Sequence, residues 1–183
     1  RGVVEMTESE VDDATQARLD EEILATLERA LDDLVAARAR EGEAIATVLK
    51  SRLAEITRLA RAAEASPALT PQAIRNRIAQ QVAALLDEAP ALDPDRLHQE
   101  AVLLATKADI REEIDRLDAH VAAAGDLLEQ GGAVGRRLDF LAQEFGRETN
   151  TLCAKSNDRA LTAIGLELKA VVDQLREQVQ NLE

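Results

Sequence analysis

Apolar residues recur at steps of three and four between residues 17 and 65, and this spacing restricts what the segment can fold into. The series is Ile23, Leu27, Leu31 and Leu34, followed after a gap by Val48, Leu49, Leu53, Ile56 and Leu59. Such steps place the side chains along one side of an α-helix. The sequence therefore predicts one helix over 17–65, on the order of 70 Å long at about 1.5 Å per residue. Polar residues at 38–43 interrupt the stripe and predict a polar waist or bend.

Prolines and glycines mark the ends of the following helices. Pro67 ends the long helix because proline lacks an amide hydrogen and disfavours helical geometry at the residue before it. Thr70 and Asp93 each precede a proline, the order expected of an N-cap followed by the first helical position. A glycine pair, Gly131 and Gly132, breaks a later segment. We predict further helices over 72–89, 94–130, 134–154 and 159–182.

The composition agrees with an all-α fold. Hydrophobic residues make up 46% of the 183 residues, but only two are Phe and none is Trp or Tyr, so the aromatic and β-branched runs of sheets are missing. We expect about five long antiparallel helices with coiled-coil-like packing. The single cysteine, Cys153, cannot form an internal disulfide and is interpreted as a small packing residue. With no apolar leader and no apolar run of 18 residues, we expect a cytoplasmic protein that does not associate with membranes.

Residues 135–158 form the most polar of the predicted helical patterns. Arg137, Glu144, Glu148 and Thr151 share one face, beside a narrow apolar seam; the seam consists of Leu138, Leu141, Phe145 and Leu152. A face rich in carboxylates and guanidinium groups can bind a divalent cation through oxygen and a phosphate through arginine. A solvated face held by ion pairs is an equally good explanation of these residues alone.

A second polar stripe runs along the predicted helix 94–130, next to an apolar seam. It consists of Asp109, Glu113, Arg116 and His120. Glu113 and His120 offer a metal ligand and a general base, and Arg116 could hold a phosphate or orient a carboxylate. A single helical histidine is more often structural than catalytic, and that alternative stays open. The sequence contains no glycine-rich phosphate loop, paired-cysteine zinc spacing, Gly-x-Ser-x-Gly elbow or HExxH motif.

Several motifs of this chain together resemble the C-terminal region of the YicC/YloC family of bacterial endoribonucleases. They are Gly135-Arg136-Arg137-Leu138-Asp139-Phe140, Gln143-Glu144, Arg147-Glu148, Asn150-Thr151-Leu152, Lys155-Ser156 and Arg176-Glu177-Gln178-Val179-Gln180-Asn181, with Glu112-Glu113-Ile114-Asp115-Arg116-Leu117 and His120 upstream. The likeness is close over 97–183 and loose over 1–90. Gly146 and Cys153 depart from the family pattern.

The resemblance implies a metal-dependent endoribonuclease that takes part in RNA degradation, with Mn²⁺ or Mg²⁺ as cofactor, and a homo-oligomer that is commonly hexameric. Family proteins carry an N-terminal α/β domain, so we expect residues 1–16 to be a polar linker from a domain absent here. Residues 17–92 would then form an arm or oligomerisation region, and residues 93–183 the catalytic region. We expect this chain alone to be inactive or weak.

The resemblance and the two polar stripes together nominate the site residues. The expected catalytic residues, which are also the expected metal ligands, are Glu113, His120, Glu144 and Glu148. The expected RNA-phosphate contacts are Arg116, Arg136, Arg137, Arg147 and Lys155.

The overall charge argues against RNA binding. The formal net charge is −13, whereas sequence-independent binding depends on Lys and Arg neutralising phosphates. The acid is concentrated elsewhere, since residues 135–159 carry five basic and four acidic side chains. The alternative function is a non-enzymatic helical scaffold, in which long amphipathic helices pair with other chains and the charged faces serve solubility and register.

Overall fold

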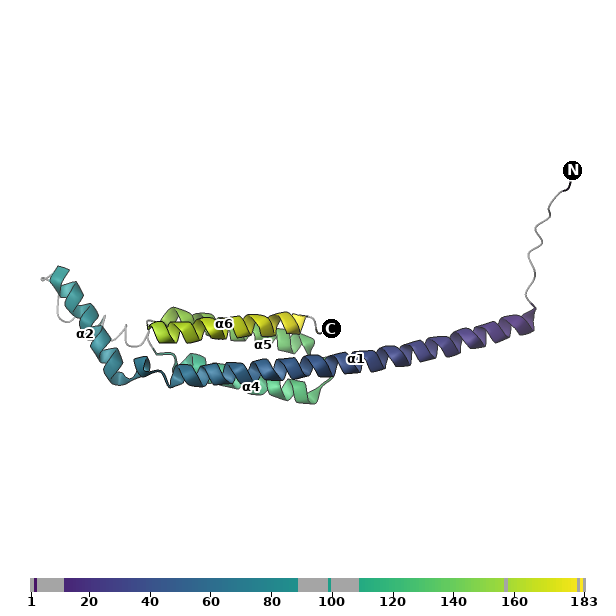
Figure 1. The fold of residues 1–183 in the computed structure, drawn as a ribbon, viewed down its shortest axis with the longest axis horizontal. Helices are drawn as coiled ribbons and strands as arrows, with labels where there is room; N and C mark the ends of the chain where they lie inside the picture. Colours follow the sequence, from purple (N-terminus) through teal and green to yellow (C-terminus); the bar gives the residue numbers. More distant parts are fainter. Residues whose placement is uncertain are drawn as a thin grey trace. The chain divides into compact units, whose positions relative to one another are not determined.

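The computed structural model describes residues 2, 12–88, 99, 109–156, 158–180 and 182. Over these residues the chain is helical and contains no strand, which confirms the predicted all-α class. The α-helices, labelled in Figure 1, are α1 (Asp13–Glu64), α2 (Pro71–Glu88), α4 (Arg111–Gln130), α5 (Gly135–Lys155) and α6 (Arg159–Gln180). A short 3-10 helix, η1 (Pro67–Leu69), lies between α1 and α2 in the sequence. No helix of the described part is both long and apolar enough to cross a membrane.

The chain divides into two compact units, residues 1–44 and residues 45–183, and α1 contributes residues to both. The helix α1 continues without a break across 38–43, where the sequence predicted a polar waist. Within the first unit, no other described residue covers the apolar stripe of α1, whose large side chains are between 48% and 67% exposed. They are Leu19, Ile23, Leu24, Leu27, Leu31, Leu34 and Val35.

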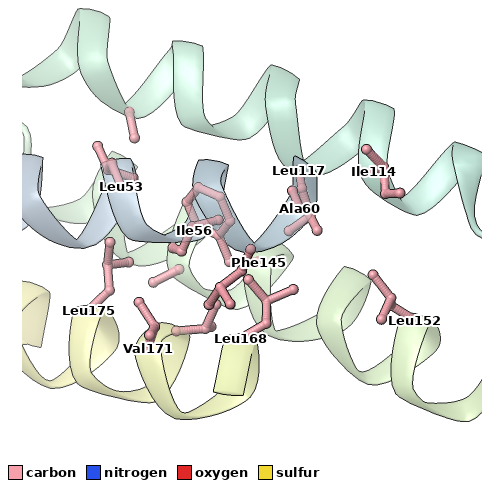
Figure 2. Close-up of a cluster of buried hydrophobic side chains, with 14 of the residues drawn as sticks. Leu53, Ile56, Ala60, Ile114, Leu117, Phe145, Leu152, Leu168, Val171 and Leu175 are labelled. Carbon is pink, nitrogen blue, oxygen red and sulfur yellow. The ribbon is translucent and has the colours of Figure 1, made fainter. Parts of the chain in front are cut away.

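The second unit has a core to which the end of α1, α4, α5 and α6 all contribute. Figure 2 shows Phe145 of α5 among side chains of α1 and α6, including Ile56 and Leu168. Phe145, Ile56 and Leu168 are completely buried. Full burial of such a side chain stabilises a fold by about 1.5–3 kcal/mol relative to exposure. The predicted seam of α5 is therefore observed, with Leu141 only partly buried.

The short connections between helices are stabilised by capping hydrogen bonds and by glycine. The side chain of Ser66 accepts a hydrogen bond from the amide of Ala68 at the start of η1. Thr70 Oγ1 accepts one from the amide of Ala73 at 3.3 Å, so Thr70 caps α2 as predicted. Gly131 and Gly132 have φ values of 65° and 77°, a conformation that favours glycine and ends α4 where expected.

One predicted helix is interrupted at Asp109 and Ile110, although Gln99, within its predicted span, is helical. The sequence predicted a helix over 94–130, but Asp109 and Ile110 are not helical and α4 begins at Arg111. The Asp109 side chain accepts a hydrogen bond from the amide of Arg111 at 3.0 Å, which competes with continuous helix at this point. Residues 94–98 and 100–108 of the prediction lie outside the described residues. The other helix ends agree with the predictions to within four residues.

Candidate metal and phosphate site

The candidate site is formed by one face of α4 and one face of α5. His120 of α4 and Glu144 and Glu148 of α5 each offer a ligand atom, and these atoms all lie within 4.8 Å of one another. Glu144 and Glu148 are four residues apart, so they project from successive turns of the same helix face. The His120 ring meets the Phe145 ring edge to face, with centroids 5.8 Å apart and an interplanar angle of 80°. The core residue Phe145 thus packs against the imidazole of His120.

Glu148 is a buried carboxylate, and Arg116 is its partner. Arg116 Nη1 donates to Glu148 Oε1 at 3.2 Å, and Arg116 Nη2 donates to Glu112 one turn earlier on α4. The hydrogen bond that Arg116 donates to Glu148, and then the charge of Glu112, raise the pKa of the Arg116 guanidinium above its usual value. Arg116 therefore remains charged, as a buried carboxylate requires of its partner.

Glu144 has a partner on its own helix. Arg147 Nη1 donates to Glu144 Oε2 at 3.0 Å, across the i,i+3 spacing of α5. Glu144 is only partly exposed, whereas Arg147 projects from the surface. Each carboxylate of the cluster is thus paired with one arginine.

Glu113 does not join the cluster. Lys155 Nζ donates to its two carboxylate oxygens at 2.8 and 3.0 Å and to the main-chain oxygen of Asp109 at 3.0 Å. Lys155 thereby ties the end of α5 to the start of α4. Glu113 was expected as a metal ligand and Lys155 as a phosphate contact, but each is occupied by the other. Going along α4 from Glu113 to Arg116, the partner moves back along α5 from Lys155 to Glu148, so the two helices are antiparallel.

The remaining arginines expected to contact phosphate lie near the start of α5. Arg137 donates to Gln130 Oε1 at 3.3 Å, and Arg136 is exposed. Arg137 is seven residues from Glu144, a separation of about 10 Å along a helix. Two of the five expected phosphate contacts, Arg116 and Arg147, therefore lie at the cluster. Arg136 and Arg137 lie nearer the start of α5, and Lys155 bonds Glu113.

Two contributors to the site were not identified from the sequence. Glu112 holds Arg116 through an i,i+4 pair, and that spacing is visible in the sequence. Phe145 was assigned to the apolar seam alone. Phe145 lies between Glu144 and Glu148 in the sequence. This position could have indicated that a metal-binding side chain of the facing helix would pack against the Phe145 ring.

Comparison with known proteins places this chain in a family. Residues 62–183 match the family model for the C-terminal region of YicC-like endoribonucleases, and this span includes every residue of the cluster. The chain belongs to the YicC-like endoribonuclease family. The resemblance found in the sequence motifs is thereby confirmed.

Two YicC relatives show how far the similarity extends. The probable endoribonuclease YicC of Haemophilus influenzae is 40% identical over 182 residues, which cover 100% of this chain and 61% of the relative. The probable endoribonuclease YicC of Clostridioides difficile is 38% identical over 109 residues, 60% of this chain and 37% of the relative. The similarity to the Haemophilus protein thus extends well beyond the region 97–183. The chain spans less than two thirds of the length of either relative.

Proposed function

We propose that this protein is a metal-dependent endoribonuclease, and that this chain supplies a divalent-cation site formed by His120, Glu144 and Glu148. The observation that carries the proposal is the convergence of one imidazole and two carboxylates from facing helices within 4.8 Å. Imidazole nitrogen and carboxylate oxygen are both established ligands of divalent metals. The names of the two relatives support the ribonuclease assignment.

The donor set also favours one cation over another. Mg²⁺ prefers oxygen ligands and retains several waters, whereas imidazole suits softer transition metals. A site with one histidine and two carboxylates therefore favours Mn²⁺ over Mg²⁺. Glu113 is left out of this ligand set because both of its oxygens are bonded to Lys155.

The chemistry of RNA cleavage assigns roles to the surrounding residues. A divalent cation held here would lower the pKa of a bound water or ribose hydroxyl and neutralise charge that develops on the phosphate. Arg116 and Arg147 would orient the phosphate, since a guanidinium group matches its oxygens in a paired geometry. Phe145 and Glu112 hold His120 and Arg116 in position.

The test is cleavage of single-stranded RNA by the full-length protein in Mn²⁺. We expect Glu148→Gln or His120→Ala to reduce the cleavage rate at least about 100-fold. Changing a residue that only supports a metal ligand typically costs about 10- to 100-fold, and loss of the ligand itself should cost more. Glu167→Gln removes a carboxylate that pairs with Arg58 away from the site, so it should cleave as the wild type does. Unaltered cleavage in both site variants would contradict the proposal.

A specific observation also favours self-association. The apolar stripe of α1 in residues 19–35 is exposed over about five helical turns, and exposed apolar patches of this kind mark interaction surfaces. Its three- and four-residue steps suit pairing with another helix of the same kind. We propose that copies of the chain associate through this stripe, which is compatible with the homo-oligomer implied by the family. The scaffold function would then accompany catalysis rather than replace it.

A further inference from the structure

The arginines of the candidate site and its ligand carboxylates are paired one to one. Arg116 of α4 binds Glu148 at 3.2 Å, and Arg147 of α5 binds Glu144 at 3.0 Å. The two carboxylate side chains are 3% and 15% exposed, whereas the arginine side chains are 53% and 68% exposed. The carboxylates are therefore fixed within the helix pair, while the guanidinium groups reach them from the solvent side and have room to turn away.

We propose that a divalent cation and an RNA phosphate bind this site cooperatively, with Arg116 and Arg147 as the residues that couple them. The inference rests on the proposed function, because it assumes that His120, Glu144 and Glu148 bind the cation. A cation among these donors binds the same two carboxylate groups that the two arginines now neutralise. Its binding therefore competes with both ion pairs and makes the guanidinium groups available to an anion.

The charges at the site give the coupling its direction. Glu112, Glu144 and Glu148 carry three negative charges against two positive charges on Arg116 and Arg147, a net charge of −1. A divalent cation changes this to +1, an excess of positive charge close to a buried carboxylate. That excess opposes cation binding and attracts a phosphate, whose negative charge relieves the repulsion. Because linkage is reciprocal, RNA must strengthen cation binding by the same factor by which the cation strengthens RNA binding.

The surroundings keep the displaced arginines close to the site. Arg116 is also bonded to Glu112, an exposed residue one turn earlier, so it remains anchored on α4 when it leaves Glu148. The adjacent pair of Glu113 and Lys155 is balanced within itself and does not compete for the arginines. A phosphate is thus the ligand that fits the released guanidinium groups.

The experiment measures both affinities in the full-length protein. The RNA probe is a single-stranded 2′-O-methyl oligonucleotide, which lacks the attacking hydroxyl. Mn²⁺ binding is measured with and without a saturating amount of this oligonucleotide. Binding of the oligonucleotide is measured in EDTA and in saturating Mn²⁺. For the wild type, we expect each ligand to strengthen the other about tenfold, within the usual range for coupled sites. In the double variant Arg116→Gln with Arg147→Gln, the coupling should fall below about twofold. Mn²⁺ binding without RNA should be at least as tight as in the wild type, because the repelling charges are gone.

A charge-matched control separates this coupling from a general loss of positive charge. Arg58→Gln with Arg61→Gln removes two arginines that pair with Glu167 and Asp118, outside the cluster. This control should retain wild-type coupling. Wild-type coupling below about twofold, coupling that persists in the site double variant, or equal loss in the control would each overturn the inference. If the wild type binds Mn²⁺ and cleaves RNA without coupling, only this inference fails; if it neither binds Mn²⁺ nor cleaves, the proposed function fails with it.

Discussion

Two neighbouring residues of α5, Glu148 and Thr149, are both buried but differ in how their polar atoms are satisfied. Glu148 is paired with Arg116, whereas Thr149 Oγ1 has no hydrogen-bond partner among the residues described. Thr149 is completely buried beside a seam of apolar residues. A buried hydroxyl without a partner is costly because it has given up its bonds to water. The unpartnered hydroxyl of Thr149 therefore lowers the stability of the core.

Replacing Thr149 with valine should stabilise the protein. Thr149→Val exchanges the unpartnered hydroxyl for a methyl group of similar size, and we expect the free energy of unfolding to rise by about 1 kcal/mol. Urea denaturation followed by circular dichroism measures this change. Thr151→Val is the matched control: Thr151 Oγ1 donates to the main-chain oxygen of Arg147, so no comparable gain is expected there. A loss of stability in Thr149→Val would show that the hydroxyl is satisfied after all.

Helical spacing identified the residues of the candidate site but not all of their partners. It placed His120, Glu144 and Glu148 on polar faces, and the structure brings these three together. It could not show that Glu113 binds Lys155, because the helical period gives the face of each residue and not the register of one helix against the next. Register depends on how the seams of both helices interlock, which is a property of the folded core. The metal-ligand roles themselves stay predictions.

At the level of elements, the sequence predicted most helix ends but not the break in the helix just before α4. Proline, threonine and glycine signals located the break before α2 and the turn after α4 because each acts through its own backbone chemistry. The start of α4 depends on Asp109, whose side chain binds the amide of Arg111 and whose carbonyl oxygen binds Lys155 from α5. The second bond joins residues 46 positions apart, and a local pattern does not contain it.

Two helical glycines should respond oppositely to alanine. Gly146 in α5 has open space where a Cβ would lie, so Gly146→Ala should raise the free energy of unfolding by about 1 kcal/mol through helix propensity. A Cβ on Gly165 in α6 would lie 2.8 Å from Cys153 Sγ and 3.4 Å from a methyl carbon of Leu152. Gly165→Ala should therefore lower the free energy of unfolding, by about 1–3 kcal/mol if the core cannot adjust.

Thermal and urea denaturation of the two variants compare these effects directly. Cys153→Ala combined with Gly165→Ala removes the sulfur that the new methyl group would meet, and it should recover part of the loss. Equal stability of Gly165→Ala and the wild type would mean that Cys153 moves aside without cost. The close approach of α6 to α5 at Gly165 would then be more adaptable than the distances indicate.

On the scale of the whole molecule, the exposed stripe of α1 makes a prediction about assembly. Leu27→Gln with Leu31→Gln removes two apolar side chains from the stripe while leaving the core of residues 45–183 untouched. We expect the proposed oligomer to dissociate, since each side chain that it would cover contributes about 1.5–3 kcal/mol through burial. Light scattering after size-exclusion chromatography measures the change.

The control for assembly is another exposed leucine. Leu166 on α6 is 59% exposed but stands outside the stripe, so Leu166→Gln should leave the oligomer size unchanged. If the α1 double variant keeps the wild-type mass, the surface that joins the copies lies elsewhere.

The turn at Gly131 and Gly132 has a consequence for the speed of folding. It folds α4 back on α5, so the ion pairs between these two helices join residues only 32 and 42 positions apart. Closing such short loops costs little chain entropy, and chains dominated by nearby contacts fold quickly. The donors of the candidate site are thus brought face to face by a single helical hairpin. We therefore expect α4 and α5 to pair earlier in folding than α1 packs against the rest of the core.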